Sequence, residues 1–137
     1  MPLLEQVLNK NTENVKIVFK NLPLPNHSMA RPAAFAALAA GEQGKFWEYH
    51  DALFAEKRIT QNYLTELAGT LGLDMQQFEQ DRESFKIQSL VSRDMKEAQA
   101  IGITGTPTIY VNGKKLRERS LPGFQAMIDT ALQQVKK

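Results

Sequence analysis

The chain has no cysteine among its 137 residues. This absence excludes disulfide bonds, thiolate metal sites and every thiol nucleophile. Cysteine usage therefore gives no information about the redox state of the compartment in which the protein works. Any catalysis by these residues alone has to proceed without a sulfur nucleophile.

Long hydrophobic runs are also absent. The longest run of small apolar residues, Ala33–Ala40, covers no more than about half of the ~20 residues that a membrane-spanning helix needs. No basic and apolar leader precedes it at the N-terminus. The sequence predicts neither a membrane span nor an export signal.

Neither sign of charge dominates, since 17 basic residues are set against 15 acidic ones and the net charge is +2. Nucleic-acid binding usually requires the neutralisation of several phosphates, so nucleic acid is not an expected partner. Hydrophobic residues make up 42% and charged residues 23% of the sequence, which is the balance of a folded globule. At this length we expect a single domain over residues 1–137.

Motifs for cofactor or metal chemistry are missing. The sequence has no glycine-rich phosphate loop, no His-x-x-x-His pair and no Gly-x-Ser-x-Gly elbow, so it predicts no cofactor and no metal site. His27 has no serine or carboxylate spaced to cooperate with it, and we expect a loop cap or an exposed side chain. His50 and Asp51 are adjacent rather than on one helix face, which predicts a packed histidine and not a metal-ligand pair.

Hydrophobic periodicity predicts a mostly helical chain with two strand regions. Val15–Leu22 alternates in the manner of a half-buried strand, and prolines end it. Thr108–Val111 predicts a second strand, Asn112-Gly113 a two-residue turn, and residues 114–119 the return strand of a hairpin. Helices are expected at 3–8, from an Asn26 or Ser28 cap to 41, at 42–56, from Thr60 to Gly72, from Asp74 to a break at 82–84, from there to Gly102, and after Ser120.

The order of these elements predicts an α/β domain rather than a doubly wound parallel sheet. A helical insertion over residues 26–101 would lie between the first strand and a C-terminal β-hairpin and helix. Within the insertion, Asp74 and Gln77 form a capping-box pattern. An aromatic set recurs at helical spacing, which favours core positions over a ligand groove: Phe46, Trp47, Tyr49 and Phe54.

Three segments carry a resemblance to a known family: PLPNHSMARPAAFAALAAGEQGKFWEYHDALF at 23–54, LGLD at 71–74 and GITGTPTIYVNG at 102–113. In order and spacing they resemble the DsbA-like branch of the thioredoxin superfamily, whose members are thiol:disulfide oxidoreductases. The resemblance covers essentially the whole chain and implies a truncated thioredoxin-like fold. The family's Cys-x-x-Cys, and the central strand that leads into it, have no counterpart in these residues.

The missing strand would, by this resemblance, lie between the counterparts of Val15–Leu22 and Thr108–Val111. Such a gap would leave backbone N–H and C=O groups unpaired, at a cost of roughly 1–3 kcal/mol for each buried group. We therefore expect a homo-oligomer, in which strands are swapped or paired between copies, or a rearranged sheet. Because most family members are exported, the resemblance also implies a periplasmic or other extracytoplasmic origin.

The resemblance implies one candidate binding loop, at Thr106-Pro107. This pair matches the family's cis-proline pair, beside which an extended peptide or protein substrate would pair by strand addition in the full-length parent. The alternative is a tight entry into the hairpin that binds nothing. The basic residues that follow are better explained as protection of a sheet edge than as a site for an acidic partner: Lys114, Lys115, Arg117 and Arg119.

Two functions stay open on these grounds. In the first, the chain is the C-terminal part of a DsbA-like thiol:disulfide oxidoreductase and is inactive in isolation, because both redox cysteines would lie upstream of Met1. In the second, it is a cysteine-free, noncatalytic thioredoxin-like module that binds extended peptides or self-associates. An in-frame Cys-x-x-Cys codon pair upstream would argue against the second. A purely helical interaction module would require the ordered resemblance to be a coincidence.

Overall fold

The computed structural model describes residues 2–24 and 27–135. The chain forms two compact units. The terminal unit consists of Met1–Phe19 and Gly105–Lys137, and the helical unit consists of Lys20–Thr104. Each unit has its own hydrophobic core. The single domain with an insertion over 26–101 stays a prediction.

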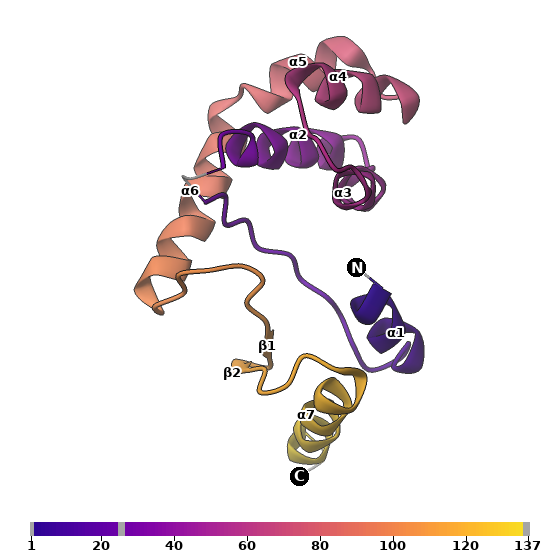
Figure 1. Ribbon diagram of the computed structural model, residues 1–137, viewed down its shortest axis with the longest axis vertical. Helices are drawn as coiled ribbons and strands as arrows, with labels where there is room; N and C mark the ends of the chain where they lie inside the picture. The colour runs from indigo at the N-terminus through magenta and orange to yellow at the C-terminus, as the bar shows by residue number, and fades with distance from the viewer. Residues whose placement is uncertain (1, 25–26, 136–137) are drawn as a thin grey trace. The chain divides into compact units, whose positions relative to one another are not determined.

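The helical unit is built around one alanine-rich helix, α2 (Ala30–Glu42). Its neighbours are α3 (Phe46–Ala55), α4 (Gln61–Thr70), α5 (Met75–Arg82) and α6 (Phe85–Ala100), all of which contact α2, as Figure 1 shows. Small side chains allow this close approach, because Ala36, Ala39 and Ala40 are fully buried in the centre of the unit. The predicted helical content of this region is therefore confirmed.

Tyr49 anchors the core of the helical unit. Its side chain is fully buried, and its hydroxyl donates a 2.8 Å hydrogen bond to the backbone carbonyl of Leu64. Its ring lies 6.0 Å from the ring of Phe78. Burial raises the pKa of the Tyr49 hydroxyl, because the apolar surroundings disfavour the phenolate. The residue thus joins α3 to α4 as a neutral hydrogen-bond donor.

Helix caps in this unit largely follow the sequence prediction. Thr60 and Asp74 accept hydrogen bonds from backbone N–H groups three residues on, at 3.1 and 3.0 Å, and Ser84 caps α6 in the same way. The reciprocal half of the predicted capping box is wrong. The Gln77 side chain donates to Asp81 at 2.8 Å, while Gln43 accepts the hydrogen bond from the Asp74 N–H at 2.8 Å.

Two predicted helix starts are also wrong. The N-cap of α2 is Met29, which makes no side-chain capping bond, so Ser28 does not cap this helix; Asn26 lies outside the described residues. The helix expected from 42 begins only at Phe46. A turn separates it from α2, and Gly44 in that turn has a φ of +77°, which glycine adopts at little cost.

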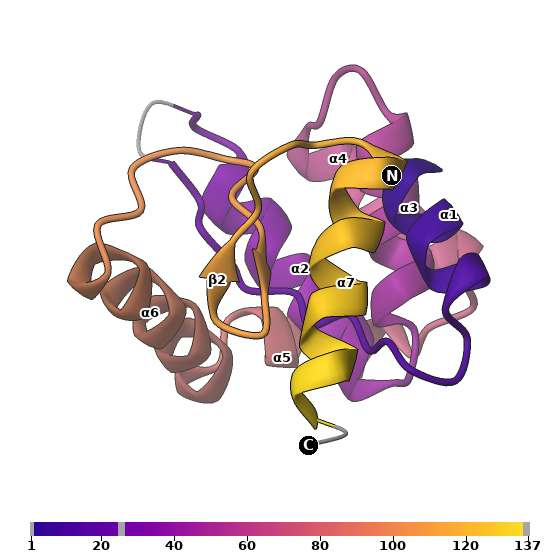
Figure 2. The same cartoon turned by 90° about the horizontal axis from the view of Figure 1, so that it is seen from below.

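The terminal unit joins the two ends of the described chain. It contains α1 (Pro2–Lys10), α7 (Leu121–Val135) and a hairpin of β1 (Tyr110–Val111) and β2 (Lys114–Lys115). α7 contacts both α1 and β1, and Figure 2 shows it lying along α1. The buried centre is formed by three apolar side chains from α1 and α7: Val7, Phe124 and Ile128.

A reciprocal amide pair supplements this apolar contact. The Asn11 side chain, just after α1, donates to Gln125 on α7 at 2.9 Å, and Gln125 donates back to Asn11 at 3.0 Å. Asn11 also donates to the carbonyl of Val7 at 2.8 Å. Because Asn11 is only 6% exposed, losing these partners would leave buried polar atoms unsatisfied.

The hairpin turn is confirmed, but its strands are shorter than predicted. Asn112 and Gly113 have φ angles of 46° and 81°, as a two-residue primed turn requires. Tyr110 pairs with Lys115 and Val111 with Lys114 in antiparallel register. Beyond these pairs only the hydrogen bond from the Leu116 N–H to the Ile109 carbonyl, at 2.8 Å, continues the ladder.

The predicted strand over Val15–Leu22 is wrong. Among the described residues the sheet consists of β1 and β2 alone, so this segment has no strand neighbour with which to form a ladder. The segment is also divided between the two units after Phe19. Within the helical unit, the N–H of Asn21 donates to the buried carboxylate of Asp94 at 3.0 Å.

Gly123, in the first turn of α7, is required by a close backbone approach. Ser120 caps the helix by accepting a hydrogen bond from the Gly123 N–H at 3.0 Å, as predicted. A Cβ atom at Gly123 would collide with the carbonyl oxygen of Glu118 and lie 2.9 Å from the Cβ of Glu118. The entry into α7 therefore requires a residue without a Cβ atom at position 123.

We predict that Gly123→Ala destabilises the protein by about 2–3 kcal/mol, because backbone atoms must move to admit the new methyl group. Gly69→Ala is the matched control: Gly69 lies on α4 with open space around its Cα. The control should be neutral or up to about 1 kcal/mol more stable than the unsubstituted chain. Urea unfolding of both variants measures the difference, and equal stabilities would contradict the close approach.

Candidate functional site

The Thr106-Pro107 loop lies in the terminal unit, just before β1. Both residues are exposed, and the peptide bond between them is cis. The loop is closed by the Thr108 hydroxyl, which donates a 2.7 Å hydrogen bond to the carbonyl of Gly105. This bond holds the backbone on either side of Thr106 and Pro107 in a defined turn.

An apolar pocket adjoins this loop. It has a volume of about 120 Å³ and is lined mainly by aliphatic and aromatic atoms. We call it the Pro107 pocket and define it by its lining residues: Pro2, Leu3, Leu4, Pro107, Ile109, Arg119 and Phe124. No local sequence pattern indicates this pocket, because its walls come from α1, from the segments before β1 and before α7, and from α7 itself.

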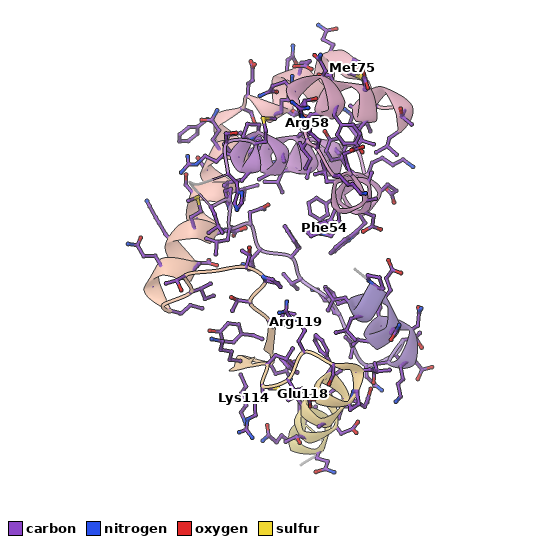
Figure 3. The ribbon with its side chains drawn as sticks, in the orientation of Figure 1. Phe54, Arg58, Met75, Lys114, Glu118 and Arg119 are labelled. Carbon is purple, nitrogen blue, oxygen red and sulfur yellow. The ribbon has the colours of Figure 1, made fainter. Side chains whose placement is uncertain are left out.

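Among the described residues that line the pocket, Arg119 is the one with a charged side chain. Its side chain is exposed, and none of the ion pairs within the described residues includes it. Figure 3 shows it on the segment between the hairpin and α7, pointing away from Lys114. The pocket thus combines apolar walls with a cation that forms no ion pair among the described residues.

The other members of the predicted basic run lie on the hairpin and just after it. Lys114 and Lys115 form β2, and both are exposed, as is Arg117. None of the three lines the Pro107 pocket. Protection of a sheet edge by these residues stays a prediction.

The two histidines show no catalytic arrangement in the described part of the chain. His27 is exposed, in line with its predicted loop position. His50 is buried, as predicted, and its Nδ1 atom lies 3.1 Å from a carboxylate oxygen of Asp51. Its ring packs beside that of Phe54, with 4.5 Å between centroids. Within residues 2–24 and 27–135, no group of three or more acidic or histidine side chains is placed to hold a metal ion.

The prediction that the aromatic set on α3 is core is only partly correct. Tyr49 is fully buried, whereas Trp47 is 45% and Phe54 58% exposed; Figure 3 labels Phe54 on α3. The aromatic stripe is wider than the face that α2 and α4 cover. Trp47 instead packs edge-on against Phe46, with ring centroids 5.1 Å apart.

Comparison with known proteins identifies the family. The DSBA-like thioredoxin domain matches residues 3–133 of this chain. The chain belongs to that family. The predicted resemblance is therefore confirmed, and so is the truncated thioredoxin-like fold, which here is mostly helical with a small two-stranded antiparallel sheet.

A solved structure supports the same conclusion. The thioredoxin-like oxidoreductase from Silicibacter pomeroyi DSS-3 superposes with a TM-score of 0.87 and shares 27% sequence identity. The match covers 97% of this chain and 77% of that protein. Nearly all of the present chain is therefore similar to an oxidoreductase of this fold.

Curated relatives are longer proteins. The chain is 35% identical over 116 residues to the Na(+)/H(+) antiporter NhaA 1 of Salinispora arenicola and 38% identical over 95 residues to the antiporter NhaA of Herminiimonas arsenicoxydans. It spans 18% and 15% of their lengths. As for the present chain, every helix within the described residues is too short or too polar to cross a lipid bilayer.

Proposed function

We propose that this chain is the C-terminal part of a DsbA-like thiol:disulfide oxidoreductase and that it catalyses no thiol–disulfide exchange by itself. The observation that carries the proposal is a DSBA-like domain over residues 3–133 without a single cysteine. Disulfide exchange requires a thiolate that attacks a substrate disulfide and forms a mixed disulfide. Both sulfurs would have to come from residues outside this chain.

The proposed contribution of these residues is substrate binding by the Thr106-Pro107 loop. Thr106 and Pro107 are exposed, and an apolar pocket lies beside them. An extended peptide can pair its main chain with an exposed backbone segment and place alternate side chains in adjoining pockets. In this arrangement the loop holds the peptide while the chemistry takes place elsewhere.

The competing proposal is a noncatalytic module that binds peptides or self-associates as part of a larger protein. The antiporter relatives favour it, because the similarity to this chain occupies less than a fifth of their length. A region similar to this chain is thus part of a much longer chain in those proteins. Both proposals share the peptide-binding loop, and they differ in whether cysteines on a neighbouring segment act on the bound peptide.

We predict that the isolated chain gives no redox turnover in either direction. Reduction of insulin by dithiothreitol, and oxidation of a dithiol peptide by glutathione disulfide, should proceed at the rates of the protein-free reactions. A cysteine-containing thioredoxin run in parallel provides the positive control. A rate above the protein-free blank that scales with chain concentration would overturn the proposal, since the chain has no sulfur nucleophile.

We predict that binding of extended peptides depends on the backbone of Thr106 rather than on its side chain. Thr106→Pro removes the N–H donor and should weaken binding about fivefold, the equivalent of one main-chain hydrogen bond of ~1 kcal/mol. Thr106→Ala keeps the donor and should bind within about twofold of the unsubstituted chain. Titration calorimetry measures both. Equal losses in the two variants would assign the contact to the side chain instead.

We also propose that the short sheet gains a strand from a second copy of the chain. Among the described residues the sheet has two strands of two residues each, whereas an isolated two-stranded hairpin is marginally stable at best. Val15–Phe19 supports the proposal, because it has a strand-like sequence and belongs to the same unit as the hairpin. Its Val18 side chain is 63% exposed.

We predict a concentration-dependent dimer or larger assembly in sedimentation equilibrium. Val18→Pro should shift the equilibrium to the monomer, because proline removes a ladder donor and is excluded from central strands. Val18→Thr is the control, since threonine keeps both the donor and the β-branched shape, and it should associate like the unsubstituted chain. A compact monomer at the highest concentrations would contradict the proposal that a second copy adds a strand to the sheet.

A further inference from the structure

We infer that the Pro107 pocket and Arg119 together select an extended peptide that carries an aliphatic side chain and, two residues away, an acidic side chain. The inference rests on the proposed peptide-binding role of the Thr106-Pro107 loop and specifies its ligand. Recognition would then depend on the apolar residues that line the pocket beside Pro107 and on the cation of Arg119.

The pocket fits one branched aliphatic side chain. Its volume of about 120 Å³ is somewhat smaller than the ~150 Å³ cavity, lined by similar residues, that accommodates benzene. Leu3, Leu4 and Ile109 contribute aliphatic walls, and Phe124 contributes an aromatic one. A leucine or isoleucine side chain would lose its hydration there without leaving a polar group unsatisfied. A lysine or glutamine side chain would have no hydrogen-bond partner at the floor.

Charge complementarity identifies the second group. Arg119 lines the pocket, is exposed, and forms no ion pair with any acidic side chain in the described part of the chain. Its guanidinium can donate two parallel hydrogen bonds to a carboxylate. The adjacent residue Glu118 is also absent from the ion pairs of the described residues. An acidic side chain on the ligand would therefore be attracted to the rim and would fix the register of the bound peptide.

The spacing of the two groups follows from the extended conformation. Successive side chains of a strand point to opposite faces, so residues i and i+2 share one face and lie about 7 Å apart along the chain. Arg119 belongs to the pocket wall itself, so a carboxylate two residues from the aliphatic anchor would reach it. The expected ligand pattern is thus aliphatic-x-acidic, in either chain direction.

The first test uses three short fluorescent peptides, identical except for the central pattern Leu-Thr-Asp, Leu-Thr-Asn or Ala-Thr-Asp. Anisotropy titrations with the whole chain should give the tightest binding for Leu-Thr-Asp. The Asn peptide should bind about two- to fivefold more weakly, which is the range of an exposed ion pair. The Ala peptide should bind about tenfold more weakly or worse, because most of the buried apolar area is lost.

The second test reverses the charge at residue 119 of the protein. Arg119→Glu should weaken binding of the Leu-Thr-Asp peptide about tenfold. It should instead favour binding of a Leu-Thr-Lys peptide, because residue 119 would then repel an acidic side chain and attract a basic one. Arg117→Glu is the matched control: it makes the same change in net charge two residues away, at an exposed residue outside the pocket. It should leave the preference for Asp over Lys in place. Melting curves of both variants show whether either substitution disturbs the fold.

A third test uses a second pair of variants to probe the apolar wall of the pocket. Leu4→Phe places a larger side chain in the pocket wall and should abolish the preference for Leu over Ala in the peptide. Leu8→Phe is the control on the same helix, at a residue that is 38% exposed and does not line the pocket. It should bind all three peptides like the unsubstituted chain.

The outcomes separate this inference from the proposed function. If no peptide binds, the peptide-binding role fails and the inference fails with it. If all three peptides bind equally and Arg119→Glu behaves like Arg117→Glu, the binding role stands and the inference is overturned. If Leu4→Phe alters the sedimentation of the chain but not peptide binding, the pocket is occupied by a second copy, which also overturns it.

Discussion

Packing of α7 against α1 is the constraint on which the terminal unit depends. The two helices bury Val7, Phe124 and Ile128 between them, and the amide pair of Asn11 and Gln125 joins residues that are 114 positions apart in the sequence. Closing so long a loop costs conformational entropy, which local helix propensity cannot offset. The apolar contact and the buried amide pair therefore have to hold the unit together.

The candidate site is a consequence of the same packing. α7 supplies Phe124 to one wall of the Pro107 pocket, and the first turn of α1 supplies another. The segment that links the hairpin to α7 places Arg119 at the rim and brings the Glu118 backbone against Gly123. The pocket beside the loop contains no redox residue, and the proposal assigns only substrate binding to it. This separation of binding from chemistry is what the proposed function uses.

Several local signals in the sequence predicted the structure correctly, although the predictions of the Ser28 cap and of the reciprocal half of the capping box were wrong. The caps at Thr60 and Asp74 and the turn at Asn112-Gly113 depend on residues within a few positions of one another, and the structure contains all three. The prediction for Val15–Leu22 was wrong, because a strand exists only if another strand pairs with it. Exposure of Trp47 was missed for a similar reason, since helical spacing cannot show how much of a stripe the neighbouring helices cover.

The sequence by itself determined that the chain has no thiol chemistry, because that conclusion follows from composition alone. It also determined the family and the candidate loop at Thr106-Pro107, because a continuous segment carries both. Only the tertiary structure decided that a pocket adjoins the loop and that Arg119 lines it. The walls of this pocket come from opposite ends of the chain, and no short-range pattern specifies which distant side chains will meet.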